Sequence, residues 1–212
     1  MQIEDWAQRW AEGKIGFHEG RPNTLLAAHV EELGARRRVF VPLCGKTEDM
    51  AFLVSRGHEV VGLEAVEPAV VAFFAEHDLT PEVERGPRGL RFYRARGITI
   101  LAGDVFAATV EDLGGADALY DRAAMVALPP DVRPRYVDHL RAVLPAGSPG
   151  LLVTFDYDQT KIPGPPFAVS EAEVRRLYAG AEVTHLATTN GAGPKFESAG
   201  IPATESCFKL VL

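Results

Sequence analysis

The chain has little of what a disulfide framework, a zinc site or a nucleic-acid surface requires. Its 212 residues include only two cysteines, Cys44 and Cys207, too few for a disulfide network or a structural zinc site. Lys and Arg number 22 against 29 Asp and Glu, and the net charge of -7 gives no support for a nucleic-acid surface. The one dense basic run, residues 36–38, directly precedes an apolar strand and is typical of a solvated helix end. We therefore expect neither a metal nor a nucleic acid as a partner.

Long hydrophobic runs are also missing. No apolar stretch approaches the length that crosses a membrane. The first ten residues, MQIEDWAQRW, are polar and acidic, which predicts no signal peptide. A hydrophobic content of 47% is enough for one sizeable core, and the length predicts a single domain over residues 1–212. We expect a soluble, cytoplasmic monomer that does not bind membranes.

The chain is organised around residues 37–64. An apolar strand, 39–41, leads into a turn, 42–46, and then into a helical pattern whose apolar face carries Met50, Leu53 and Val54. A second apolar strand, 60–63, ends on an acid, Glu64. The spacing predicts a strand-turn-helix-strand unit with a nucleoside-sized crevice at the strand ends.

Glu64 is the candidate ribose ligand of this crevice. It lies 21 residues beyond Leu43, a spacing that fits an acid accepting hydrogen bonds from ribose hydroxyls. A solvated Glu at the end of an ordinary strand explains the spacing equally well. The turn contains only Gly45, whereas the dinucleotide fingerprint needs three glycines for close approach to a pyrophosphate. The turn therefore favours a ligand with a ribose and no phosphates, such as S-adenosylmethionine.

Strands and helices alternate through the rest of the chain, which predicts an α/β doubly wound sheet. The further predicted strands are 98–102, 116–121, 151–155, 183–187 and 206–212, with a surface hairpin that includes 90–95. Asp104 follows one of these strands and either forms a turn or contacts an adenine amino group. Arg122 follows another strand and either faces the crevice or pairs with Asp121 at the surface.

Two further segments carry candidate functions. Trp6 and Trp10 are four residues apart on a predicted amphipathic helix, where they either cap the core or face a ligand. Residues 161–167 contain three prolines in four positions, which makes a stiff loop after a strand. Such a loop is either a wall over the crevice or a rigid connector.

Together these motifs resemble the thiopurine S-methyltransferase family over nearly the whole chain. The matching motifs, in order, are Trp6 to Trp10 with 15–18, then 41–46, 57–58 with 61–64, 120–122 with 128–129, and 164–167. The resemblance implies a Rossmann-like, seven-stranded, mostly parallel sheet with an antiparallel last strand and helices on both faces. It also implies that residues 1–34 form a helical cover and that S-adenosylmethionine is the methyl donor.

The resemblance assigns roles by position. The residues that match the family's cofactor contacts are Trp10, Leu43, Glu64 and Arg122, with Asp104 and Val105 at the adenine end. The residues that match its acceptor site are Phe17, Pro165 and Pro166, with Lys195 where relatives carry an arginine. A lysine keeps that charge but loses the bidentate geometry of a guanidinium.

The predicted function is transfer of a methyl group to the thiol of an aromatic or heterocyclic acceptor such as a thiopurine. Arg122 is the predicted catalytic residue, acting directly on the acceptor or through water. Cys44 has no His or second Cys beside it in the sequence and reads as a packed turn residue. Alternative acceptors are thiocyanate, small thiols and selenium or tellurium oxyanions. Alternative functions are a nicotinamide-dependent reductase and a cofactor-binding regulator without turnover.

Overall fold

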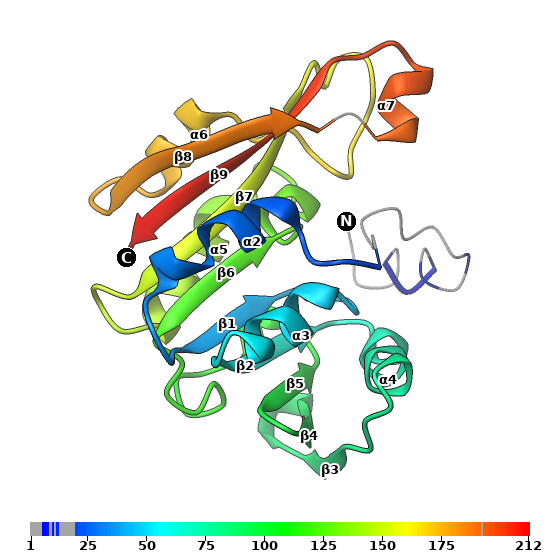
Figure 1. Cartoon of the computed structure of the whole chain (residues 1–212), viewed down its shortest axis with the longest axis vertical. Coiled ribbons are helices and arrows are strands. Elements are labelled where there is room, and N and C mark those ends of the chain that lie inside the picture. Colours follow the sequence, from blue (N-terminus) through cyan, green and yellow to red (C-terminus); the bar gives the residue numbers. More distant parts are fainter. Residues whose placement is uncertain (1–5, 9, 11, 13–19, 192) are drawn as a thin grey trace.

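A computed structural model describes residues 6–8, 10, 12, 20–191 and 193–212. The described chain forms one mixed sheet of nine strands in the order β3-β4-β5-β2-β1-β6-β7-β9-β8 (Figure 1). The strands are β1 Arg38–Pro42, β2 Glu59–Glu64, β3 Glu82–Arg85, β4 Arg91–Ala95, β5 Ile98–Ala102, β6 Ala118–Arg122, β7 Pro149–Tyr157, β8 Glu182–Asn190 and β9 Ala203–Val211.

The centre of the sheet is parallel and its two margins are antiparallel. Strands β5, β2, β1, β6 and β7 pair in parallel, so their carboxyl ends meet at one edge of the sheet. The last strand, β9, runs antiparallel to both β7 and β8, as the family resemblance implies. Ligands of such sheets bind outside the carboxyl ends of the parallel strands.

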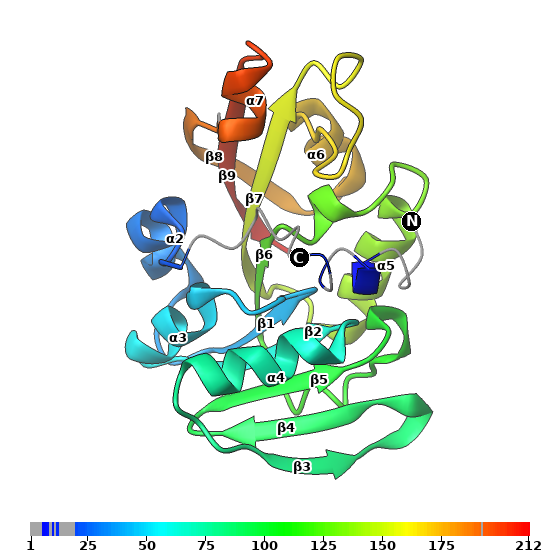
Figure 2. The same cartoon turned by 90° about the vertical axis from the view of Figure 1, so that its right-hand side faces the viewer.

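Helices cover both faces, as predicted. They are α2 Thr24–His29, α3 Glu48–Ser55, α4 Glu67–Glu76, α5 Arg133–Val143, α6 Glu171–Leu177 and α7 Pro194–Ser198, with 3-10 turns η1 Val30–Leu33, η2 Pro87–Gly89, η3 Val105–Ala107 and η4 Met125–Ala127. Figure 2 shows the centre of the sheet nearly edge-on, with α2 and α3 on one side and α5 and α6 on the other.

Each face has its own apolar core. On one face, Leu26 of α2, Met50 of α3 and Phe73 of α4 pack on the central strands and have no exposed surface. On the other face, Tyr136 of α5 and Val174 of α6 do the same. These two layers fix the central strands, and the strand ends therefore present their side chains from a rigid base.

The predicted count of seven strands is wrong. Strands β3 and β4 form a hairpin, and β4 pairs with β5 in an antiparallel ladder, which extends the sheet to nine strands. The predicted strand 183–187 is also too short, because β8 continues to Asn190, and the helix α7 follows it between Pro194 and Ser198. In the described part of the chain, no helix is long and apolar enough to cross a membrane.

Candidate active site

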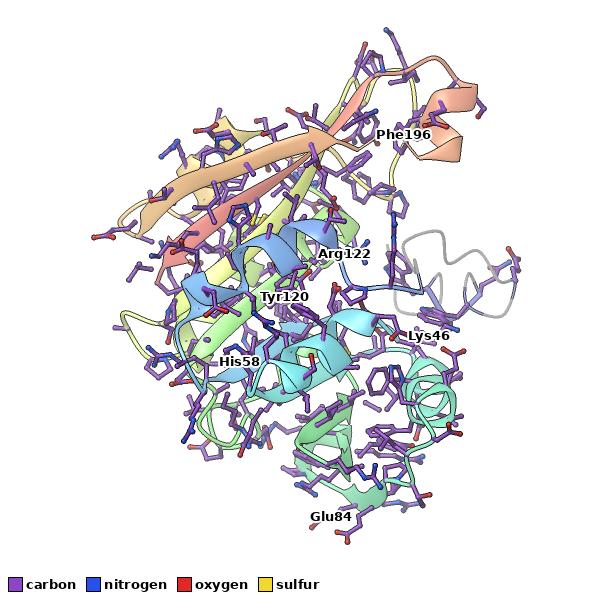
Figure 3. The ribbon with its side chains drawn as sticks, in the orientation of Figure 1. Lys46, His58, Glu84, Tyr120, Arg122 and Phe196 are labelled. Carbon is purple, nitrogen blue, oxygen red and sulfur yellow. The ribbon has the colours of Figure 1, made fainter. Side chains whose placement is uncertain are left out.

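A cavity lies at the carboxyl ends of β1, β2 and β6, where the parallel sheet predicts a ligand. Four of the residues assigned to the cofactor from sequence line it, namely Trp10, Leu43, Glu64 and Arg122. Figure 3 shows Arg122 and Lys46 toward this end of the sheet and His58 toward the opposite end. These four distant sequence positions therefore line one cavity, and their roles toward a cofactor stay a prediction.

The turn after β1 shapes one wall of the cavity. Leu43 and Gly45 both have positive φ angles, 45° and 54°, which folds the backbone sharply before α3 begins. A left-handed non-glycine residue such as Leu43 is strained and is found where the surrounding structure imposes it. Here the Cys44 N–H donates to the Leu63 carbonyl at 3.0 Å, which ties the turn to the end of β2.

Glu64 is held by the backbone on both sides. Its Oε2 accepts from the Gly45 N–H and its Oε1 from the Val66 N–H, each at 2.8 Å. The side chain is buried, and burial raises the pKa of the carboxyl above its usual value, while the N–H groups of Val66, Gly45 and Ala65 oppose that shift. A carboxylate has about four acceptor positions, so this one keeps capacity for further donors such as ribose hydroxyls.

Arg122 is positioned by the residue before it. Asp121 is fully buried and accepts from the Met125 N–H at 3.1 Å and from the Tyr136 hydroxyl at 2.8 Å. Burial raises the pKa of Asp121 to about 6. These bonds fix the sharp turn at Ala123, where φ is 68°, and so hold the backbone that carries Arg122. The alternative of a surface Asp121–Arg122 pair is wrong, because Asp121 has no exposed surface.

A buried polar cluster joins the start of α2 to this site. Asp49 of α3 has no exposed surface and accepts from the Asn23 N–H at 2.7 Å and from the Tyr120 hydroxyl at 2.8 Å. The Asn23 side chain in turn caps α2 by accepting from the Leu25 and Leu26 N–H groups. The chain entering α2 is therefore fixed to β6 two residues before Arg122.

The proline loop is held in place by side chains and backbone. The Tyr157 hydroxyl donates to the Pro166 carbonyl at 2.7 Å and to the Ile162 carbonyl at 3.2 Å. The Phe167 N–H donates to the Val126 carbonyl at 2.6 Å, beyond the end of β6. Pro165 and Pro166 are half-buried and do not themselves line the cavity.

The structure separates the remaining predicted residues from the cavity or leaves them undescribed. Asp104 is exposed and caps η3 by accepting from the Phe106 N–H at 3.0 Å, and Val105 is buried in the core. Neither lines the cavity. Phe17 lies outside the described residues, and Lys195 lies in α7 with its side chain outside the description.

Several residues that line the cavity were not predicted as site residues. They are Trp6, Cys44, Thr47, Ala65, Ala123 and Ala127. The spacing of Trp6 and Trp10 was a usable signal, because positions i and i+4 of a helix lie on one face. The alanines carry no such signal in the sequence, because an alanine on a cavity wall differs from an alanine in a core only in its neighbours.

Cys44 is expected to be dispensable for turnover. Its thiol is buried, and burial together with the Glu64 carboxylate raises its pKa well above the usual value, so the reactive thiolate is disfavoured. The Sγ packs so closely on Gly62 that a Cβ built there would lie 2.8 Å from it. Cys44→Ala should retain most of the wild-type kcat, measured with saturating cofactor. Loss of the chemical step with intact cofactor binding would contradict this.

The chain is similar in sequence to known methyltransferases. A family model described as Thiopurine S-methyltransferase (TPMT) matches residues 1–210. The thiopurine S-methyltransferase of Pseudomonas aeruginosa (strain UCBPP-PA14) is 53% identical over 182 residues, 85% of this chain and 83% of that protein. The thiopurine S-methyltransferase of Pseudomonas fluorescens (strain Pf0-1) is 45% identical over 211 residues, 97% of this chain and 96% of that protein.

Solved structures share the fold at lower identity. A 1,6-didemethyltoxoflavin-N1-methyltransferase of Burkholderia thailandensis, with S-adenosylhomocysteine bound, aligns with a TM-score of 0.67 at 16% identity over 99% of this chain and 87% of that chain. TehB from Haemophilus influenzae aligns with a TM-score of 0.60 at 14% identity over 87% of this chain and 60% of that chain. At these identities the matches establish the α/β methyltransferase fold and no further property.

Proposed function

Because the chain belongs to the thiopurine S-methyltransferase family, we propose that it transfers a methyl group from S-adenosylmethionine to the thiol of an aromatic or heterocyclic acceptor. The observation that carries this proposal is the cavity in which Glu64, Arg122 and Trp10 meet at the carboxyl ends of the parallel strands. The two Pseudomonas relatives described above are named thiopurine S-methyltransferases.

The residues of the cavity fit S-adenosylmethionine. Glu64 has acceptor capacity for the two ribose hydroxyls, and its backbone donors keep it in place without using that capacity. The turn at Leu43 has one glycine and suits a nucleoside rather than a pyrophosphate. Trp10 offers an aromatic face, which attracts cations such as a sulfonium. When bound, S-adenosylmethionine supplies a methyl group on a positively charged sulfur that is a good leaving group.

The chain's own contribution to catalysis is positioning and charge. A thiol has a reference pKa of about 8.5, so part of an acceptor is ionised near neutral pH without a strong base. Arg122 can stabilise the thiolate or orient a heterocycle, and Asp121 holds the backbone that carries it. Fixed placement of two reactants supplies roughly 7–11 kcal/mol in favourable cases, which makes a rigid site the main requirement.

The acceptor side is proposed from the family pattern. Phe17 would face the acceptor ring, Pro165 and Pro166 would form the opposite wall, and Lys195 would supply a cation at the far end. The restraints on the proline loop from Tyr157 and Phe167 support a fixed wall rather than a mobile connector. Asp104 and Val105 stay proposed adenine contacts. Asp104 is exposed, and accepting from the Phe106 N–H uses one of its roughly four acceptor positions, which leaves capacity for an amino group.

Product formation tests the proposal directly. The purified protein is incubated with S-adenosylmethionine and a panel of thiopurines, thiophenols, thiocyanate, small alkyl thiols and tellurite, and S-adenosylhomocysteine is measured. Methylation of the flat thiols at the highest kcat/KM supports the proposal. Highest kcat/KM with thiocyanate, small thiols or an oxyanion would assign the alternative acceptors, and absence of product with every thiol would reject S-methyl transfer.

Phe17→Ala tests the proposed stacking contact. Aromatic contacts add about 0.5–1.5 kcal/mol beyond surface burial, so KM for thiopurines should rise roughly three- to tenfold. KM for a small anion such as thiocyanate should change far less, because it offers no ring to stack. Trp6→Ala is the comparison variant. Trp6 lines the cavity together with Trp10, so its removal should weaken cofactor binding more than acceptor binding. Equal KM changes for flat and small acceptors would contradict the stacking role of Phe17.

We also propose that residues 1–34 cover the cofactor and that the protein acts as a cytoplasmic monomer of one domain. Support for the cover comes from Trp6 and Trp10, which line the cavity from the N-terminal segment. The net charge of -7 favours a monomer through repulsion between copies. Light scattering at several concentrations tests the oligomeric state. Hydrogen exchange of residues 12–22 with and without cofactor tests the cover, and equal protection would reject it.

A further inference from the structure

Arg133 is completely buried although it begins a helix. It is the first residue of α5, and the capping position before it, Val132, provides no side-chain hydrogen bond. A cation at a helix N-terminus is disfavoured by the helix dipole, and a buried guanidinium is costly unless its donors are paired. The local stability of α5 therefore gives no reason for an arginine here, and its role must be sought in its tertiary partners.

Those partners come from three separate segments. Nε donates to the Leu128 carbonyl at 3.1 Å. Nη1 donates to the Ala168 carbonyl at 3.2 Å and to the Glu173 carboxylate of α6 at 2.9 Å. Nη2 is buried without a hydrogen-bond partner among the described residues. The guanidinium is thus used for directional contacts at the cost of one unsatisfied donor group.

The two carbonyls lie on the two loops that border the proposed acceptor site. Leu128 directly follows η4, and η4 ends on Ala127, which lines the cavity with Arg122. Ala168 directly follows the proline loop, two residues beyond Pro166. A single planar group therefore bridges the segment after Arg122 to the proposed acceptor wall, beside the Phe167–Val126 backbone bond described above.

We propose that Arg133 is a positioning residue that fixes the spacing between the segment carrying Arg122 and the proline loop, and thereby the preference for flat acceptors. This inference rests on the proposed function. Guanidinium donors point in fixed directions, so they can set a distance between two carbonyls, whereas an ammonium group on a flexible stem cannot. A flat ring needs both walls at the right separation, while a small acceptor needs only the methyl group and Arg122.

The test compares acceptors in Arg133→Lys and Arg133→Met. With a flat thiol such as a thiophenol, kcat/KM should fall roughly ten- to a hundredfold, since small misplacements of bound reactants cost that much. With thiocyanate or a small alkyl thiol, kcat/KM should change less than about threefold, and cofactor Kd should be unchanged within that range. Arg133→Lys keeps the positive charge but cannot contact both carbonyls. It should therefore lose the preference for flat acceptors, as Arg133→Met does.

A matched control comes from the same helix. Arg141 of α5 donates from Nη2 to the Ala179 carbonyl at 2.9 Å and contacts neither loop of the site. Arg141→Met removes an arginine–carbonyl contact of the same kind and should leave the ratio of flat to small acceptors at its wild-type value. If Arg141→Met and Arg133→Lys change the ratio equally, or if Arg133→Lys leaves it unchanged, the inference is wrong.

Glu173→Gln keeps the test decisive if Arg133→Met does not fold. The amide oxygen still accepts from Nη1, so the loop contacts can form, but the charge that orients the guanidinium is gone. The ratio of flat to small acceptors should shift in the same direction as in Arg133→Lys, by a smaller factor. Failure of the wild type to methylate any thiol rejects the proposed function itself. A methylating wild type with an unchanged ratio in Arg133→Lys and Glu173→Gln rejects only the role of Arg133.

Discussion

Arg122→Ala is expected to lower kcat and kcat/KM together by roughly a hundredfold, the loss typical of removing one preorganised charge from a reacting centre. Arg122 lies at the end of β6 and lines the cavity, and Asp121 fixes its backbone through Met125 and Tyr136. Equal losses in the two constants indicate an interaction made in the transition state. A rise in KM alone, with kcat unchanged, would assign Arg122 to binding and contradict the catalytic role.

The pH profile separates two ways in which Arg122 can act. If its charge lowers the pKa of the bound thiol, removing it raises that pKa, and the ascending limb of kcat against pH moves to higher pH. The loss of kcat in Arg122→Ala should then become smaller above a pH of about 9, where a free thiol is ionised without help from Arg122. If Arg122 orients the acceptor instead, the deficit persists at every pH. Arg94→Ala is the control, because Arg94 pairs with Glu84 on the exposed hairpin.

The part of the site that could be predicted from sequence is the part built by short-range patterns. Val39 to Glu64 reads as a strand-turn-helix-strand unit because its apolar periodicity changes twice, at a turn that contains Gly45 and again at Gly57. Since parallel strands end at one edge, the positions of Glu64 and Arg122 followed from the strand ends alone. The family resemblance, confirmed by the comparisons, supplied Trp10 and Leu43.

The part that could not be predicted depends on contacts between distant segments. Strand β3, Glu82 to Arg85, has no apolar alternation and every residue is exposed, so only its ladder to β4 reveals it. Helix α7 has five residues, too few for a periodic pattern. Arg133 looks like a surface residue at a helix start, and its burial follows only from the approach of the loops at Leu128 and Ala168.

Glu64→Ala is expected to weaken binding of S-adenosylmethionine roughly ten- to a hundredfold, because hydrogen bonds to a charged group contribute about 1.5–3 kcal/mol. Glu64→Gln should not rescue binding. Its NH₂ group would face either the Gly45 or the Val66 N–H, which both donate to the carboxylate. Glu67→Ala is the matched control, since Glu67 lies three residues on, binds Arg91 and Tyr93, and does not line the cavity.

Titration calorimetry of the wild type across pH adds a second, independent result for Glu64. Ribose hydroxyls donate to the carboxylate, so cofactor binding favours its ionised form. Burial raises the pKa of Glu64, and affinity should therefore be full above that pKa and fall as the pH drops through it. Glu64→Gln cannot ionise and should show a flat profile over the same range. An unchanged Kd in folded Glu64→Ala, or a Glu64→Gln profile with the wild-type slope, would show that the ribose is held elsewhere.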